Sequence, residues 1–261
     1  MPIVCIGDVG PIDSMFHVGD EAMFDQLVRE LGARGLTDLI GLSSNPTDTA
    51  ERYGIRAIAP IGFGGLSRAE QDERMQRVLA AASGECDALA QTDPARAVID
   101  AIRTSDGLAI AGGGNMSTLW PMHVYERATL GLLAQHFGKP HVVSGQTLGP
   151  QLGERDWSLV AALLNSARVV GLRESKSYEV AGRMGVADDV RQLTIDDASL
   201  LPGAPVTAGR PYCLVTLARH IGEHDRETFL TETAALLDGL ADRLNIVFSA
   251  HFGPLDGGAS R

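Results

Sequence analysis

Short apolar runs alternate with longer amphipathic segments along most of this chain. Residues 2–7 form an apolar run typical of a buried strand, and within residues 19–31 the side chains of Phe24, Leu27 and Val28 share one helical face. The same periodicities predict strands at 39–42, 55–59, 107–111, 141–144, 168–172 and 190–194, and helices at 46–54, 67–90, 94–102, 121–137, 155–166 and 174–184. This alternation indicates an α/β fold, in which a largely parallel, Rossmann-like sheet is covered by helices on both faces.

The alternation breaks at residues 202–209, whose prolines, glycines and small residues are typical of a linker. We therefore predict an N-terminal Rossmann-like domain over residues 1–203 and the start of a second such domain over residues 210–261. The second part holds one strand, one helix and one further strand, and a unit of this size buries too little apolar surface to form a lobe by itself. A truncated second domain is the expectation, and its uncovered apolar surface predicts low stability or self-association into a homo-oligomer.

Charge and cysteine content argue against several classes of function. The chain carries 33 acidic and 22 basic residues, a net charge of −11, which argues against a general binder of nucleic acid or of membrane surfaces. The 3 cysteines lie far apart, so neither a disulfide framework nor a zinc site is predicted, and a reducing, cytoplasmic location fits. We expect no secretory signal and no transmembrane segment, because no apolar run approaches the ~18–20 residues that span a bilayer.

Glycine-rich segments stand where three of the predicted strands end, at residues 7–10, 112–115 and 145–150. In open α/β sheets, ligands bind in the crevice at the carboxyl ends of the strands. Glycine permits a sharp turn there and lets a ligand approach the bare main chain. The three segments therefore predict one shared crevice, with ordinary tight turns as the alternative explanation for each.

Sequence blocks at these strand ends resemble those of the polysaccharide pyruvyl transferase family. The resemblance runs from Ile3 to about His251, and His17 stands where the family usually has Asn. The family's Arg-x-His block in the second domain has no counterpart here. The matching blocks are His17-Val18-Gly19-Asp20-Glu21-Ala22, Gly107–Asn115, Gly145–Pro150, Arg173-Glu174-Ser175-Lys176-Ser177 and Asp196-Asp197-Ala198.

The resemblance implies a glycosyltransferase-B-like pair of Rossmann-type domains with the active site in the cleft between them. It implies phosphoenolpyruvate as donor and, as acceptor, a sugar of a bacterial cell-surface polysaccharide or of its lipid-linked precursor. The product would be a cyclic pyruvate ketal. This chemistry requires an acid that protonates the methylene carbon and groups that bind carboxylate and phosphate. It requires no metal and no cofactor, and no metal-ligand spacing is present in the sequence.

Three residues are candidates for the catalytic chemistry. Arg173, at the carboxyl end of a predicted strand, is expected to clamp an anion, with pairing to Glu174 as the alternative. Asp20 is a candidate acid or base, and its alternative role is to complement the helix dipole. His251 follows the last predicted strand and is the third candidate.

Polar groups and bare main chain at the strand ends are candidates for substrate binding. The glycine triplet offers main-chain N–H groups to a ligand, whereas a strand-end turn capped by Asn115 is the alternative. Three further histidines, at positions 123, 136 and 141, are expected to be structural. The substrate-binding candidates are His17, Gly19, Gly113, Gly114, Asn115, Gln146, Arg219 and His220.

Three functions remain open from the sequence. The first is an enzyme that transfers pyruvate from phosphoenolpyruvate to a glycan or its lipid-linked precursor. The second is a nucleotide-sugar glycosyltransferase of the same architecture, which would need a nucleotide site in the second domain. The third is a non-catalytic relative that binds a glycan or a partner protein, which the His17 substitution and the missing Arg-x-His block favour.

Overall fold

The computed structural model describes residues 1–12, 15–203, 209, 211–217, 224–249 and 252–253. It divides into two units, Met1–Leu201 and Pro202–Arg261, and each is described by itself. The candidate site residues up to Arg173 lie in the first unit. The predicted site residues Arg219, His220 and His251 lie outside the described residues.

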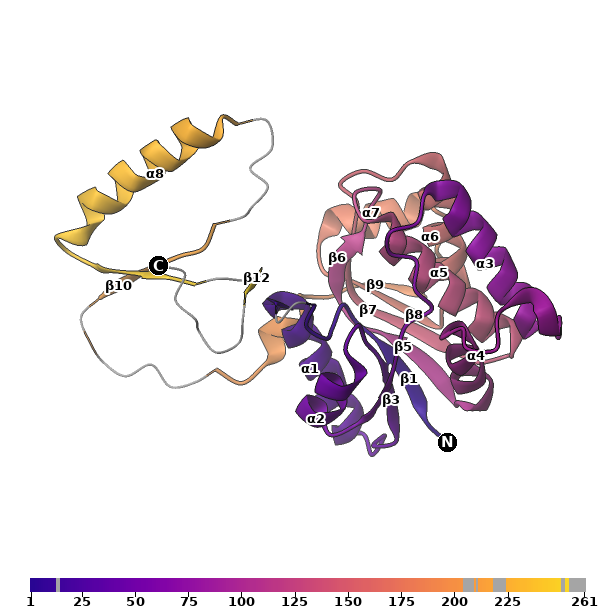
Figure 1. Ribbon diagram of the computed structural model, residues 1–261. Helices are drawn as coiled ribbons and strands as arrows, with labels where there is room; N and C mark the ends of the chain where they lie inside the picture. Colours follow the sequence, from indigo (N-terminus) through magenta and orange to yellow (C-terminus); the bar gives the residue numbers. More distant parts are fainter. Residues whose placement is uncertain (13–14, 204–208, 210, 218–223, 250–251, 254–261) are drawn as a thin grey trace. The chain divides into compact units, whose positions relative to one another are not determined.

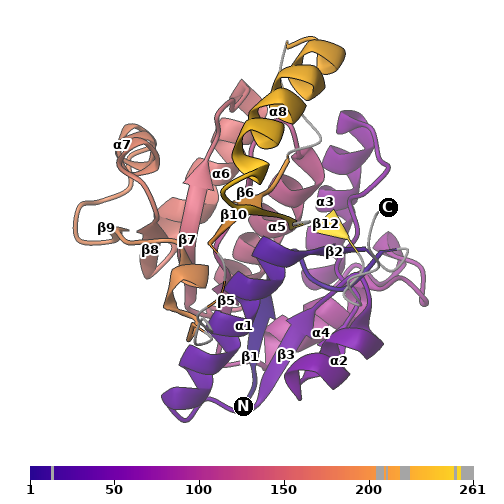
Figure 2. The ribbon, with the colours of Figure 1, turned by 90° about the vertical axis from the view of Figure 1, so that its left-hand side faces the viewer.

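The first unit is built on an eight-stranded sheet whose paired strands all run parallel. The strands stand in the order β4-β3-β1-β5-β7-β8-β9, and the short β6 pairs with β7 (Figures 1 and 2). The strands are β1 (Ile3–Ile6), β3 (Leu39–Leu42), β4 (Arg56–Ile58), β5 (Gly107–Ile110), β6 (Gly113–Met116), β7 (His141–Leu148), β8 (Val169–Leu172) and β9 (Arg191–Leu193), while β2 (Phe16–His17) precedes the first helix. Because the order reverses between β1 and β5, the topology places a binding crevice beyond the carboxyl ends of these two strands.

The helices begin close to the predicted positions. They are α1 (Val18–Ala33), α2 (Pro46–Tyr53), α3 (Arg68–Ala82), α4 (Ala95–Thr104), α5 (Pro121–His136), α6 (Glu154–Ser166) and α7 (Ser175–Arg183), with the 3₁₀ turns η1 (Cys86–Ala88) and η2 (Asp197–Leu200). Local chemistry explains several of these boundaries. Asn45 caps α2 by accepting a hydrogen bond from the Asp48 N–H, and Gly54 ends that helix with φ of 65°. A capping box between Ser67 and Glu70 begins α3.

One helix is shorter than its sequence pattern predicts. The pattern indicates a helix over residues 67–90, but α3 ends at Ala82. Gly84 follows with φ of 105°, a left-handed conformation that does not continue a helix, and η1 comes after it. The end of the helix is therefore set by this glycine rather than by the apolar periodicity.

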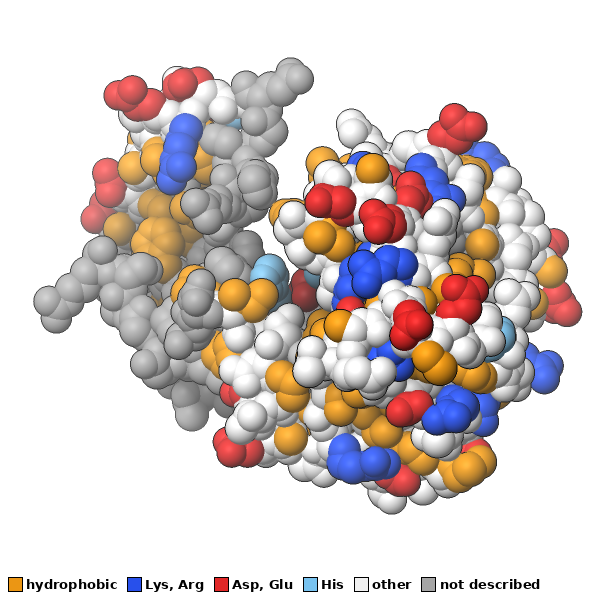
Figure 3. All heavy atoms as spheres, turned by 45° about the vertical axis from the view of Figure 1, so that its right-hand side comes forward, with side chains coloured by type: hydrophobic (Ala, Val, Ile, Leu, Met, Phe, Trp, Pro, Cys, Tyr) orange, Lys and Arg blue, Asp and Glu red, His pale blue; other side chains and the backbone are white. Residues whose placement is uncertain are grey.

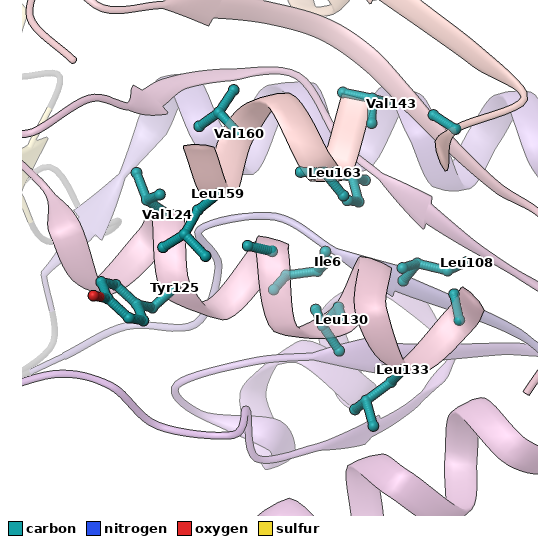
Figure 4. Packing of buried hydrophobic residues seen from close by; sticks show 14 of the residues in the cluster. Ile6, Leu108, Val124, Tyr125, Leu130, Leu133, Val143, Leu159, Val160 and Leu163 are labelled. Atoms are coloured by element: carbon teal, nitrogen blue, oxygen red, sulfur yellow. The ribbon is translucent and has the colours of Figure 1, made fainter. Parts of the chain in front are cut away.

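Alternating side chains along the strands form two hydrophobic clusters, one on each face of the sheet. Val4 and Ile6 of β1 belong to the larger cluster, which contains buried side chains of α3 to α7, whereas Cys5 packs with Phe24 of α1 in the smaller one. Figure 4 shows part of the larger cluster, where α5 and α6 pack on one another and on the strands. Two covered faces explain why strands β1, β3, β5 and β8 carry no polar side chains.

The second and third glycine segments lie largely in strands rather than in turns. Gly113 pairs with Gln146, so the triplet enters β6, and β7 continues past residue 144, where the pattern predicts its end. The glycines here make room for a buried carboxylate. A Cβ at Gly145 would lie 2.6 Å from Oδ1 of Asp197, and one at Gly112 would lie 2.9 Å from its Oδ2. The turn prediction is therefore wrong for the strand residues Gly113 and Gly145, because close packing and turning both select glycine.

The second unit contains β10 (Tyr212–Val215), α8 (Arg226–Ala241), β11 (Asn245–Phe248) and β12 (Phe252–Gly253). Strands β10 and β11 are parallel, with Tyr212 opposite Asn245. None of the described residues of α8 is buried, and Leu214 and Phe248 are 59% and 65% exposed. The self-association expected from exposed apolar surface stays a prediction.

Charged side chains of both signs are interspersed on one face of the described residues. Figure 3 shows acidic and basic groups mixed with apolar ones over the face that it draws. That face therefore offers no broad basic area of the kind that binds nucleic acid. Among the described helices, none combines the length and the apolar character needed to cross a lipid bilayer.

Candidate functional site

A cavity of about 550 Å³ lies at the carboxyl ends of the central strands, where the topology places a crevice. The segments after β1, β3 and β4 line it together with β6, the first turn of α1 and the first two turns of α5. A second cavity, of about 570 Å³, lies beside η2 and the start of α7. Asp20 and Gly114 line both cavities, so these two residues stand at their common boundary.

Asp20, in the first turn of α1, is a carboxyl group held in an environment that favours its protonated form. Burial raises the pKa of Asp20 to about 6, and the nearby negative charge of Asp8 contributes to the rise. The positive charges of Arg127, His17 and Arg173 act on this pKa in the opposite direction. A carboxyl group with such a pKa can both donate and accept a proton near neutral pH.

The turn that follows β1 is fixed by hydrogen bonds to α1. Oε1 of Glu21 accepts the N–H of Gly10 at 2.9 Å, and its Oε2 accepts the hydroxyl of Tyr53. Gly10 has φ of 90°, and a Cβ there would collide with the main-chain nitrogen of Asn45. These contacts hold Asp8 at the cavity wall.

Arg127 places a buried positive charge at the same cavity. Its side chain is 1% exposed, and its Nη1 donates to the main-chain oxygen of His123 at 3.4 Å. Its Nε and Nη2 atoms have no hydrogen-bond partner within the described part of the chain. Burial lowers the pKa of Arg127, while the negative charges of Asp8, Asp20 and Glu126 act to raise it.

Glu126 and His123 complete the α5 side of the cavity. Glu126 is buried and accepts the N–H groups of Ile61 and Gly62 at 2.7 and 3.0 Å, which anchors the loop after β4. Nε2 of His123 lies 3.5 Å from Oδ2 of Asp8. Burial lowers the pKa of His123 to about 4, and the charge on the neighbouring guanidinium contributes to that shift, so the imidazole is neutral at physiological pH.

Strand β6 contributes Gly114 and Asn115 to the first cavity, whereas Gly113 is not among the residues that line it. Asn115 is 7% exposed, and neither the oxygen nor the nitrogen of its side-chain amide has a partner among the residues described. An unpaired buried amide is costly, so the described part of the chain leaves both atoms without the hydrogen bonds that burial normally requires.

Arg173 lines the second cavity, where its own neighbours already hold it. Its Nε donates to Oγ1 of Thr147 at 2.6 Å, and its Nη1 donates to Oδ2 of Asp196. Oε2 of Glu174 is 3.7 Å from Nε. The charge of Arg173 is therefore balanced by two acids, and its Nη2 lies 3.3 Å from the position that a Cβ of Gly114 would take.

The remaining candidates fall in different places. His17 lines the first cavity, with its Nδ1 at 4.0 Å from Oδ2 of Asp20. Gly19 lines the second cavity, where a Cβ would meet no atom within 4 Å. Gln146 lines neither cavity; it is fully buried, and its Nε2 donates to the main-chain oxygen of Ala111.

Asp8, His17 and Asp20 are the described residues that could hold a metal ion, and their ligand atoms lie within 4.8 Å of one another. The guanidinium of Arg127 supplies positive charge to both of these carboxyl groups. The positive charge of Arg127 therefore partly offsets the negative charge of Asp8 and Asp20.

A family model for polysaccharide pyruvyl transferases matches residues 17–254, nearly the whole chain. The protein belongs to the polysaccharide pyruvyl transferase family. The family assignment from sequence blocks is thereby confirmed, and it makes the protein a transferase that acts on polysaccharide. No curated protein matches the sequence.

Two solved structures share the fold of this family member at low sequence identity. The Anabaena Alr3699/HepE protein, determined with UDP and glucose, has a TM-score of 0.54 and 10% identity, covering 96% of this chain and 69% of that one. The UDP-GlcNAc 2-epimerase of Methanocaldococcus jannaschii has a TM-score of 0.55 and 11% identity, covering 95% and 65%. These similarities confirm the predicted Rossmann-like, glycosyltransferase-B-like fold.

Three cavity residues of this family member are not among the candidates from sequence. Asp8 stands inside the first glycine segment, and Arg127 stands on a predicted amphipathic helix. His123 is expected to be structural, yet it lines the cavity, whereas the buried His141 bonds the main-chain oxygen of Leu163. One sequence feature could have identified two of them. His123 and Arg127 stand one helical turn apart at the start of a helix that follows a glycine-rich segment.

Substituting Gly19 by Ala separates a ligand-binding role from a structural one. The position is helical and open, so Ala should raise the free energy of unfolding by about 0.5–1 kcal/mol. Gly32→Ala, in the same helix and equally open, is the matched control. If substrate approaches the bare main chain at Gly19, only Gly19→Ala will also weaken substrate affinity. Equal affinities in the two variants would rule out that role.

Proposed function

We propose that the protein transfers the pyruvyl group of phosphoenolpyruvate to two hydroxyls of a sugar, in a polysaccharide or its lipid-linked precursor, and forms a cyclic ketal. Membership of the family supports this donor and product. The observation that carries the proposal is the position of Asp20, a carboxyl group with a pKa of about 6 between two cavities that are each lined by an arginine.

The reaction assigns Asp20 a proton-transfer role. Protonation of the methylene carbon of the donor leaves a cation at the adjacent carbon, and a sugar hydroxyl attacks that carbon as its proton leaves. The C–O bond to phosphate then breaks with its electron pair, and a second hydroxyl adds and loses its proton. One proton enters and two leave, so a single acid–base group near its pKa can serve several steps. We assign these transfers to Asp20.

Charge and hydrogen bonding support roles for the neighbouring candidates. His17 beside Asp20 suits an acceptor hydroxyl. Arg173 lines the second cavity, and the N–H groups that it does not donate to Thr147 and Asp196 suit an anionic group of the substrate. The candidates that follow Val215, which are His251, Arg219 and His220, remain proposed site residues on the strength of the sequence alone.

Gln146 is better suited to a supporting role than to contact with a sugar. Its side chain is fully buried, and its Nε2 donates to the main-chain oxygen of Ala111, just after β5. This bond ties β7 to the end of β5, where the first cavity begins. We therefore assign Gln146 to the positioning of these strands.

A nucleotide-sugar glycosyltransferase is the second candidate. It is favoured by the fold shared with the Anabaena protein determined with UDP and glucose. Under this alternative, the cavities would receive a sugar and its pyrophosphate-linked nucleotide, and phosphoenolpyruvate would have no affinity for them. The two functions therefore differ in which donor binds.

Calorimetric titration with phosphoenolpyruvate and with UDP-glucose distinguishes them. We expect saturable binding of phosphoenolpyruvate, weakened by about tenfold or more in Arg173→Ala because a charged hydrogen-bond donor is lost. Arg103→Ala, which removes an exposed arginine of α4 that pairs with Asp100, should bind as the unmodified protein does. Binding of UDP-glucose without binding of phosphoenolpyruvate would instead favour the glycosyltransferase.

A further inference from the structure

The Nε and Nη2 atoms of Arg127, unpaired among the described residues, have the geometry that binds a carboxylate. Nη1 is engaged by the main-chain oxygen of His123, which leaves Nε and Nη2 unpaired within the described residues. These two atoms carry parallel N–H bonds on the same side of the guanidinium, the arrangement that binds both oxygens of one carboxylate. Leaving such a pair unpaired in a side chain that is 1% exposed is unfavourable unless a ligand completes it.

A second unpaired polar side chain lines the same cavity. Asn115 lines it from β6 and Arg127 lines it from α5, so two residues of separate elements, each with buried groups that lack a partner in the described chain, meet at one cavity. The amide nitrogen of Asn115 can donate a hydrogen bond to a ligand oxygen, and its amide oxygen can accept one from a hydroxyl. Two independent buried side chains with unmet hydrogen bonds at one cavity indicate a preformed ligand-binding site.

The charges around Arg127 favour an anion with one negative charge over one with two. Asp8, Asp20 and Glu126 all act electrostatically on Arg127. A phosphate dianion placed there would be repelled by these carboxyl groups and would incur a larger desolvation cost than a monoanion. A carboxylate adds a single charge in a planar shape that Nε and Nη2 of Arg127 can bind.

We propose that Arg127 and Asn115 form a subsite for the carboxylate of the donor, distinct from the place that receives its phosphate. The identity of the donor rests on the proposed function, whereas the subsite itself rests on the unpaired groups and the cavity. Asp20 lines the same cavity, so a carboxylate held there keeps the donor in the space that the proposed proton-transfer group faces. Arg173, already paired with Asp196, is then left for the rest of the substrate.

The test is titration of the full chain with pyruvate, which has the carboxylate without the phosphate, and with inorganic phosphate. Arg127→Lys keeps the charge but loses the parallel N–H bonds, and Asn115→Ala removes the amide. We expect each variant to weaken pyruvate binding, Arg127→Lys by about 10- to 100-fold, with phosphate affinity unchanged. Arg103→Lys, at an exposed arginine of α4 that pairs with Asp100, is the matched control and should leave pyruvate binding intact. Thermal unfolding of every variant verifies the fold.

The outcomes separate this proposal from the proposed function. Pyruvate binding that depends on Arg127, in a protein that does not bind phosphoenolpyruvate, supports the subsite and contradicts the donor. Phosphoenolpyruvate binding that is equal in the unmodified protein and in Arg127→Lys overturns the subsite and leaves the donor intact. The subsite is also overturned if Arg127→Lys loses affinity for phosphate rather than for pyruvate. It is likewise overturned if the unmodified protein binds neither pyruvate nor phosphoenolpyruvate.

Discussion

Replacing Asp20 by Asn should abolish turnover and yet make the protein more stable at neutral pH. Asn keeps the size of the side chain but can neither donate nor accept the proton that the reaction requires, so turnover should fall by about 100-fold or more. Stability should rise because burial and the neighbouring charge of Asp8 disfavour the ionised carboxylate of Asp20. Function and stability thus change in opposite directions, as expected for a residue kept for its chemistry.

The direction of the stability effect follows from the pKa of Asp20. Folding raises this pKa from 3.8 to about 6, so the folded protein binds the proton more tightly than the unfolded chain. Stability therefore falls as pH rises from about 4 to about 6, and the loss is complete above that range. A rise of this size corresponds to about 3 kcal/mol, a cost that the Asp20→Asn variant avoids because an amide cannot ionise.

Urea denaturation at about pH 4 and at about pH 7.5 measures this effect. The gain of Asp20→Asn over the unmodified protein should be small at the acidic pH and largest at the neutral one. Asp25→Asn, on the same helix, removes a carboxylate that pairs with Arg29 and should give no such gain. An Asp20→Asn variant that is less stable at neutral pH, or one that retains turnover, would contradict the assignment.

Substituting Gly145 by Ala should be among the most destabilising changes in the first unit. The Cβ would lie 2.6 Å from Oδ1 of the buried Asp197, and φ of 40° is unfavourable for Ala. Asp197 cannot withdraw cheaply, because its Oδ2 accepts the N–H of Gly112. Overpacking and backbone strain together should reduce the free energy of unfolding by about 3–5 kcal/mol.

Gly138 provides the matched control for this substitution. It has φ of 63°, and a Cβ there meets no atom within 4 Å, so Gly138→Ala adds backbone strain alone, about 1–2 kcal/mol. The difference between the two variants in chemical denaturation measures the packing of Asp197 against β7. Equal losses would mean that the carboxylate moves freely and does not explain the glycine.

The fold was predictable because each local signal agreed with the others. Apolar strands, the Asn45 cap and the Gly54 stop placed α2 within a residue of its observed bounds. The glycine segments were harder to interpret, since the same residue serves turns and close packing. Gly10 lies in a turn, whereas Gly112 and Gly145 make room for Asp197, a partner that is distant in sequence.

The site was only partly predictable for a related reason. Asp20 stood out through a block at a helix start, but its pKa depends on burial and on Asp8, which no periodicity reveals. The one-turn spacing from His123 is the feature that distinguishes Arg127 in the sequence, and it does not reveal burial. Its importance comes from the tertiary fold, which buries it at the cavity without a partner for Nε and Nη2 among the described residues.

Pyruvyl transfer changes one carbon of the donor from an enol to a ketal, and NMR can follow that carbon. The protein is incubated with phosphoenolpyruvate labelled with ¹³C at the enol carbon and with a pyranoside that bears neighbouring free hydroxyls. We predict loss of the enol signal, a new ketal carbon signal and release of one phosphate per ketal, all absent in Asp20→Asn. Transfer of glucose from UDP-glucose to the same acceptor, with the enol signal unchanged, would contradict pyruvyl transfer.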